Sequence, residues 1–139
     1  MWSRVFVVWV TLAVMMILNG ILRVLVLVPA FGAVGAEVIS ALIAVLLILS
    51  VTHLFLRHLG PLNFRQLTAI SATWVSLTVV FEFVFGRYVD GKSWYELVQN
   101  YNLAEGHLWP LVLLTLAVAP FLSNGITRIR ELCARPRVT

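Results

Sequence analysis

The sequence has few charged residues. Of its 139 residues, 12% are charged and 61% are hydrophobic, and the mean hydropathy is +0.99. A soluble domain carries about 25% charged residues, so this chain lacks the polar surface that water requires. The shortage of charge excludes a water-soluble globular domain and predicts an integral membrane protein. No linker-like stretch divides the chain, so we expect one membrane domain over residues 1–139.

The sequence also lacks the patterns of metal and cofactor chemistry. Cys133 is the one cysteine, so no internal disulfide can form, and it has no Cys or His neighbours at metal-ligand spacing. His53 and His58 lie near the opposite membrane surface from His107, so one metal or haem iron cannot bind all three. A phosphate-binding loop, a nucleophile elbow and a paired-carboxylate motif are missing. We therefore expect no cofactor, no metal and no enzymatic activity.

Four apolar runs are present, each of a length that suits a membrane helix of about 20 residues. They cover residues 5–28, 34–56, 67–86 and 108–122, and Pro29 is expected to end the first. The first run is much longer than the roughly 7–15 apolar residues of a secretory signal peptide, so we interpret it as a span. The runs predict an all-α membrane protein, with four transmembrane helices in an up-and-down bundle.

Basic residues are concentrated on one side of this arrangement, as in the cytoplasmic loops of membrane proteins. The side that holds both termini carries Arg4, Arg57, Arg65, Arg128, Arg130, Arg135 and Arg137. We therefore expect a multi-pass protein of the bacterial inner membrane, with both termini and a basic tail, residues 125–139, in the cytoplasm. The net charge of +4 is explained by anionic lipid, and we expect no nucleic-acid partner.

The loop between the third and fourth runs contains a predicted short helix. Ser93 and Glu96 have the spacing of a capping box, so the helix should begin at Trp94 and extend to about residue 102. Its apolar residues recur on one face: Trp94, Leu97, Val98 and Tyr101. Such an amphipathic helix is expected to lie in the plane of the membrane interface. A lid over the outer ends of the bundle is the alternative.

Small residues at four-residue spacing predict helix contact faces. Ala36, Ser40 and Ala44 form such a ladder in the second run, and Ala72 and Ser76 form a shorter one in the third. Close approach of small residues is a main source of helix association in lipid. These faces serve contacts within one chain or between chains. Beside the lipid bilayer, we therefore expect a homo-oligomer or a larger membrane-protein partner.

Ionisable residues at the outer ends of the apolar runs mark the candidate site. A charge at the bilayer centre costs on the order of 2.5–3.5 kcal/mol, so such residues normally pair or serve a function. We predict an ion pair between Glu82 and Arg23, with Glu37 or Arg87 as alternative partners. The candidate intramembrane polar cluster comprises Asn19, Arg23, Glu37, Thr78, Glu82, Arg87 and His107.

Several of these residues belong to short motifs that also occur together elsewhere. The motifs are Asn19-Gly20 with Arg23, FEFVFG at 81–86, Ser93-Trp94, Tyr101-Asn102 and Trp109. In these the chain resembles an uncharacterised family of small bacterial four-helix integral membrane proteins, over most of its length. The resemblance implies the fold and carries no activity. Small multidrug exporters differ, because their essential glutamate lies in the first span.

The sequence leaves two functions open. The favoured one is a non-enzymatic accessory or assembly component of a membrane complex, in which the Arg23–Glu82 pair fixes the register of the helices. The alternative is a small transporter or channel subunit that moves protons, or a small ion or solute, past Arg23 and Glu82.

Overall fold

A computed structural model describes residues 1–134, and all regular secondary structure in this part of the chain is helical, without a strand. The long helices are α1 (Trp2–Leu22), α2 (Val28–Leu56), α3 (Phe64–Tyr88) and α5 (Trp109–Ala134). The shorter elements are the π-helix η1 (Arg23–Leu27), the helix α4 (Trp94–Gln99) and the 3₁₀-helix η2 (Leu103–Glu105). The all-helical fold class is confirmed.

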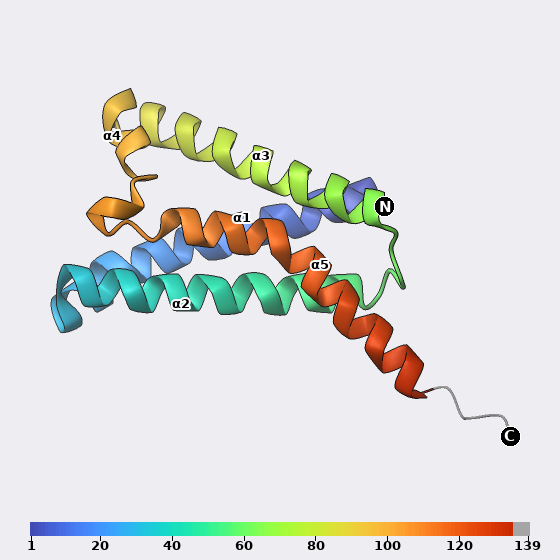
Figure 1. Ribbon diagram of the computed structural model, residues 1–139. Helices are drawn as coiled ribbons and strands as arrows, with labels where there is room; N and C mark the ends of the chain where they lie inside the picture. The colour runs from blue at the N-terminus through green and yellow to red at the C-terminus, as the bar shows by residue number, and fades with distance from the viewer. Residues whose placement is uncertain (135–139) are drawn as a thin grey trace, which may run out of the picture.

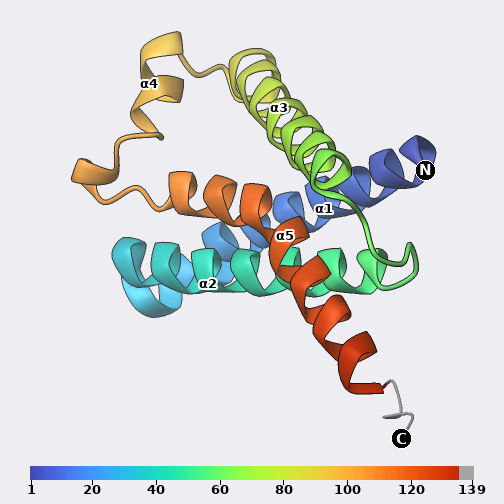
Figure 2. The same cartoon turned by 45° about the vertical axis from the view of Figure 1, so that its right-hand side comes forward.

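Three helical stretches are long and apolar enough to cross a membrane, which makes this a membrane protein. They are Trp2–Leu56, Phe64–Tyr88 and Trp109–Ala134. The first reverses direction at Gly32, whose φ of 75° and ψ of 173° form a conformation that only glycine adopts readily. Figures 1 and 2 show α1 and the longer part of α2 side by side after this turn.

The prediction that Pro29 ends the first helix is wrong. Pro29 lies inside the helical stretch, three residues before the reversal at Gly32. A proline lacks an N–H, and its ring clashes with the carbonyl of residue i−4, so it usually interrupts a helix. Here the wider turns of η1 come immediately before Pro29, where the N–H of Val28 bonds to Arg23 O. The π-helix therefore accommodates the proline.

Neighbouring long helices run antiparallel along the chain (Figure 1). The turn that precedes the longer part of α2, the helix α4 and the segment between α4 and α5 lie at one end of the bundle, which we call the α4 end. The N-terminus, the loop 57–63 and the end of α5 lie toward the other end, which we call the loop end. These three segments, which the sequence places on one side of the membrane, thus lie toward one end of the bundle.

The start of α3 and the end of α5 differ from those predicted. α3 begins at Phe64, before the predicted residue 67, because Asn63 and Gln66 form a reciprocal capping box. α5 passes through Pro120 and continues well beyond the predicted limit of 122. Residues 125–134 of the predicted tail are helical since Arg, Glu, Leu and Ala favour helix, and residues 135–139 lie outside the described part.

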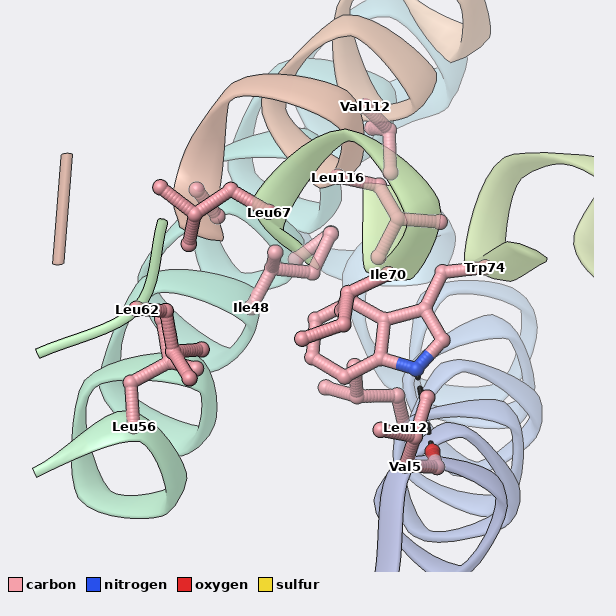
Figure 3. Packing of buried hydrophobic residues seen from close by; sticks show 12 residues of the cluster. Val5, Leu12, Ile48, Leu56, Leu62, Leu67, Ile70, Trp74, Val112 and Leu116 are labelled. Atoms are coloured by element: carbon pink, nitrogen blue, oxygen red, sulfur yellow. Dashed lines mark hydrogen bonds between the residues drawn. The ribbon is translucent and has the colours of Figure 1, made fainter. Parts of the chain in front are cut away.

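The best-packed core lies in the half of the bundle near the loop end. Trp74 is fully buried there and its Nε1–H donates to Val5 O at 3.0 Å (Figure 3). The apolar side chains that close around it come from α1, α2, α3, α5 and the loop: Leu12, Ile48, Leu56, Leu62, Leu67, Ile70 and Leu116. The indole N–H is thus paired within the chain, and the side chains that pack around the ring are apolar.

A buried asparagine fixes the loop 57–63 to α5. Asn124 Oδ1 accepts from the Leu62 N–H at 3.1 Å, and its Nδ2 donates to Leu62 O at 3.4 Å. Arg128 donates to the same carbonyl oxygen at 3.3 Å. The backbone groups of Leu62 are thus paired although the residue is buried.

The two small-residue ladders have different surroundings. Ala36, Ser40 and Ala44 are buried, which confirms a contact face on α2. Ala72 and Ser76 are exposed on α3, so they form no contact face within a single chain.

Candidate functional site

A cavity of about 310 Å³ lies among the long helices in the half of the bundle near the α4 end. Asn19 and Arg23, Glu37 and Ser40, and Thr78 and Glu82 line it from the first three segments of the bundle, and His107 lines it from the loop before α5. Its floor comprises Leu12, Ile48, Val112 and Leu116, which also belong to the apolar core. The cavity is therefore closed toward the loop end.

Glu82 is held by two aromatic donors. Its Oε2 accepts from the Tyr101 hydroxyl at 2.5 Å and from Trp109 Nε1–H at 2.6 Å. Bonds of this kind to a carboxylate are short and about twice as strong as those between neutral groups. Glu82 thus ties α3 to the segment after α4 and to the first residue of α5.

α4 brings Tyr101 to Glu82. The predicted start at Trp94 is confirmed, with the capping box of Ser93 and Glu96 formed in both directions, although α4 ends at Gln99 and not at about 102. Leu97, which is 2% exposed, packs against Gly86 so closely that a Cβ there would collide with it.

Aromatic stacking completes the cover over the cavity. The Phe83 ring stacks on Trp94 and on Tyr101, with centroids 6.2 and 6.0 Å apart. Leu97 and Asn100 line the cavity from this side. α4 and the residues after it therefore cover part of the cavity, as in the lid that the sequence left as an alternative.

Two groups of this covering segment have shifted pKa values. Burial raises the pKa of the Tyr101 hydroxyl, and the hydrogen bond to Glu82 raises it further. Tyr101 is consequently a proton donor over the whole neutral range. Hydrogen bonds from the backbone and the side chain of Ser93 lower the pKa of Glu96, so the cap of α4 is charged at neutral pH.

Glu37 holds the start of α5. Its Oε1 accepts from the Leu108 N–H at 3.0 Å and lies 3.9 Å from His107 Nδ1. The first turn of α5 has no acidic residue of its own. A negative charge near a helix N-terminus is favourable. Glu37, on α2, therefore supplies the carboxylate that the first turn of α5 lacks.

Asn19 presents an unpaired acceptor. Its side chain is largely buried, with the residue 8% exposed, and Nδ2 donates to Ser40 O at 2.9 Å. Its Oδ1 is buried and has no hydrogen-bond partner in the described part of the chain. Nearby, Thr78 is already engaged, because its hydroxyl accepts from Trp9 Nε1–H at 3.0 Å.

The predicted ion pair between Arg23 and Glu82 is not formed: no contact within 4.0 Å joins the two charges among residues 1–134. α1 and α3 diverge toward the α4 end (Figures 1 and 2), and the aromatic donors on α5 and after α4 reach Glu82 instead. Arg23 is exposed, although it lines the same cavity as Glu82.

Six residues of the predicted polar cluster line the cavity, and Arg87 is the exception. Its guanidinium donates to Lys92 O at 3.3 Å and lies 5.8 Å from the centroid of the Trp94 ring. Arg87 therefore fixes the loop that leads into α4. Sequence reasoning missed Trp109 and Tyr101 as the partners of Glu82. Their polar N–H and O–H groups were the available signal, but residues of this type at a membrane edge also suit lipid headgroups.

Residues 1–134 contain no group of three His, Cys, Asp or Glu side chains placed to hold a metal ion. No family model, curated protein or solved structure matches this chain.

Proposed function

We propose that this chain is a four-span membrane protein that binds a small solute in the cavity at the α4 end and acts as a small transporter or its solute-binding subunit. The observation that carries the proposal is the cavity, which joins intramembrane carboxylates, a buried unpaired amide oxygen and apolar walls. A concave site with few convergent polar groups is the usual form of a small-molecule site.

The reversal at Gly32 supports four spans. A straight helix of 55 residues would be about 80 Å long, more than twice the roughly 30 Å of a bilayer core. Divided at Gly32, the stretch Trp2–Leu56 supplies two antiparallel segments of suitable length. The excess of arginine at the loop end supports a cytoplasmic position for that end in a bacterial inner membrane. The cavity then faces the outer side, with α4 at the membrane interface.

The shape of the cavity suits an outward-facing binding state. Asp90 and Lys92 line its rim, and their side chains are 45% exposed, so the cavity reaches the protein surface. Toward the cytoplasmic end, the apolar floor around Leu12 and Ile48 closes it. Access from one side with closure on the other is the form that a transporter has in the outward-facing state of alternating access.

Native mass spectrometry of the full chain, extracted gently from its own membranes, tests this function. We expect a bound adduct of small-molecule mass on the wild-type chain. Ala41→Phe, which fills the cavity from α2, should remove the adduct. Leu42→Phe changes the next residue, which is 60% exposed and does not line the cavity, so this variant should keep the adduct. A wild-type chain without any small adduct would contradict solute binding.

A second function, an accessory component of a membrane complex, is favoured by a different observation. Ala72 and Ser76 leave a small-residue face of α3 exposed, which suits a helix of another chain. The same spectra distinguish the two functions, since an accessory component should appear with a stoichiometric protein partner in the wild type and in Ala41→Phe alike. Ala72→Leu should remove that partner.

A further inference from the structure

The cavity presents oxygen acceptors that the chain itself leaves unpaired. Asn19 Oδ1 is buried without a partner. Both hydrogen bonds to Glu82 reach Oε2, and the one bond to Glu37 reaches Oε1. Within residues 1–134, the second oxygens of both carboxylates therefore accept no hydrogen bond. Three oxygen acceptors on α1, α2 and α3 thus line one cavity.

Several donors around the cavity are already engaged. Tyr101 and Trp109 donate to Glu82, Trp9 donates to Thr78, and the amide N–H of Asn19 donates to Ser40. Arg23 is a charged donor of the lining, and it reaches none of the three acceptors. A ligand that pairs these acceptors therefore brings N–H or O–H groups of its own. Asn19 Oδ1 is buried without a partner, which is costly, so pairing it supplies binding free energy.

The charge of the lining is negative by one unit when His107 is uncharged. Lys92 and Asp90 pair with each other at the rim, at 3.7 Å. Glu37 and Glu82 are two carboxylates against the one guanidinium of Arg23. A single positive charge on the ligand balances this excess, whereas an anion would meet two carboxylates.

The walls select an organic cation over an inorganic one. Trp9, Phe81, Phe85 and Trp109 line the cavity together with aliphatic side chains. The faces of such rings attract ammonium groups and also pack against apolar carbon. Calcium, by contrast, needs about six to eight oxygen ligands. A volume of about 310 Å³ is at the lower end of the range for small-molecule pockets, so the ligand is small.

We propose that the cavity binds a small organic monoammonium ion, a primary or secondary amine on a short apolar or aromatic body. The N–H groups would donate to Glu82, Asn19 and Glu37, and the carbon body would pack on the aromatic walls. This proposal rests on the proposed function and names the class of its solute.

A charge series of probes tests the proposal. The full chain is placed in nanodiscs of zwitterionic phosphatidylcholine, and calorimetry measures the binding of 2-phenylethylammonium, 2-phenylethanol and phenylacetate, which share one ring. We expect the ammonium to bind at least about tenfold more tightly than the alcohol, as one charge-assisted hydrogen bond predicts, and the anion to bind most weakly.

Two matched variants locate the binding. Glu82→Gln should weaken ammonium binding by about tenfold, whereas Glu131→Gln, the same change at an exposed position near the end of α5 that does not line the cavity, should leave it unchanged. Should Glu82→Gln fold poorly, the wild-type charge series decides alone.

Equal binding of ammonium and alcohol would overturn the proposal, as would tightest binding of phenylacetate or no binding of any probe. None of these results contradicts the proposed function, because native mass spectrometry detects a bound small molecule of any chemical class. Absence of the adduct together with absence of probe binding would remove both.

Discussion

The two halves of the helical bundle differ in what their side chains enclose. Near the loop end, Trp74 is buried with its indole N–H paired to Val5 O, and apolar side chains fill the space around it. Near the α4 end, the same long helices enclose a cavity with carboxylates and an unpaired amide oxygen. Thr52 Oγ1 and Ser71 Oγ are also buried without a partner within residues 1–134, but neither residue lines this cavity. One half is thus packed around an indole, and the other is hollow around polar groups that a ligand can reach.

Two buried asparagines make the contrast sharper. Asn124 pairs both its oxygen and its nitrogen with the backbone of Leu62. Asn19 pairs only its nitrogen, with Ser40 O, and leaves Oδ1 in the cavity without a partner. Burial by itself therefore does not distinguish a structural polar residue from a binding one, whereas an unpaired group that also lines a cavity marks a candidate for binding.

The largest expected effect belongs to the packed half. Trp74→Ala should lower the free energy of unfolding by about 3–5 kcal/mol, because it opens a large cavity and removes the hydrogen bond from the indole to Val5 O. Unfolding in mixed micelles with increasing denaturing detergent measures this loss. Trp2→Ala, at a 53% exposed position of the same residue type, should change stability by less than about 0.5 kcal/mol. Similar losses in both variants would contradict a core at Trp74.

The two asparagines should differ next. Asn124→Ala should cost about 1–3 kcal/mol, since it leaves the buried N–H of Leu62 without a partner. Asn19→Ala removes one hydrogen bond and one unsatisfied oxygen, so its net cost should be about 0.5–1.5 kcal/mol at most. The same detergent unfolding compares them. A larger loss for Asn19→Ala would show that the α4 half is the structural one.

The smallest effect is a pH dependence of the cover over the cavity. The pKa of Tyr101 is raised in the folded chain, so the unfolded chain loses the phenolic proton first. Its contribution is fully present below the ordinary tyrosine pKa of about 10 and is lost as the pH rises above that value. Thermal unfolding in alkaline buffers should show this fall in the wild type, and it should be weaker in Tyr101→Phe. Identical alkaline profiles would contradict a buried Tyr101–Glu82 bond.

Local signals in the sequence predict much of this fold. Hydropathy locates the long helices, the capping box of Ser93 and Glu96 fixes the start of α4, and the Ala36–Ser40–Ala44 ladder marks a buried face. These features depend on residues a few positions apart. The capping box of Asn63 and Gln66 was equally local, and it could have placed the start of α3.

Contacts between distant residues were less predictable. Pro29 is the stronger helix breaker by residue type, yet the chain turns at Gly32, since the π-helix accommodates the proline. The partners of Glu82 lie 19 and 27 residues away, on segments whose approach depends on how α4 docks. Charge alone favoured Arg23, because an ion pair can be expected from sequence whereas a carboxylate held by aromatic donors cannot.

Cysteine accessibility in spheroplasts tests the central claim most directly, that the α4 half holds an outward-open cavity which prefers cations. In a Cys133→Ser background, Ala41→Cys lies in the cavity and Leu42→Cys on the exposed face beside it. We predict that Ala41→Cys reacts with an impermeant trimethylammonium thiosulfonate added from outside, and at least about tenfold more slowly with the sulfonate analogue, as one net charge predicts. Leu42→Cys should react with neither. The account would be contradicted if Ala41→Cys reacted with neither reagent, or if it reacted faster with the anionic one.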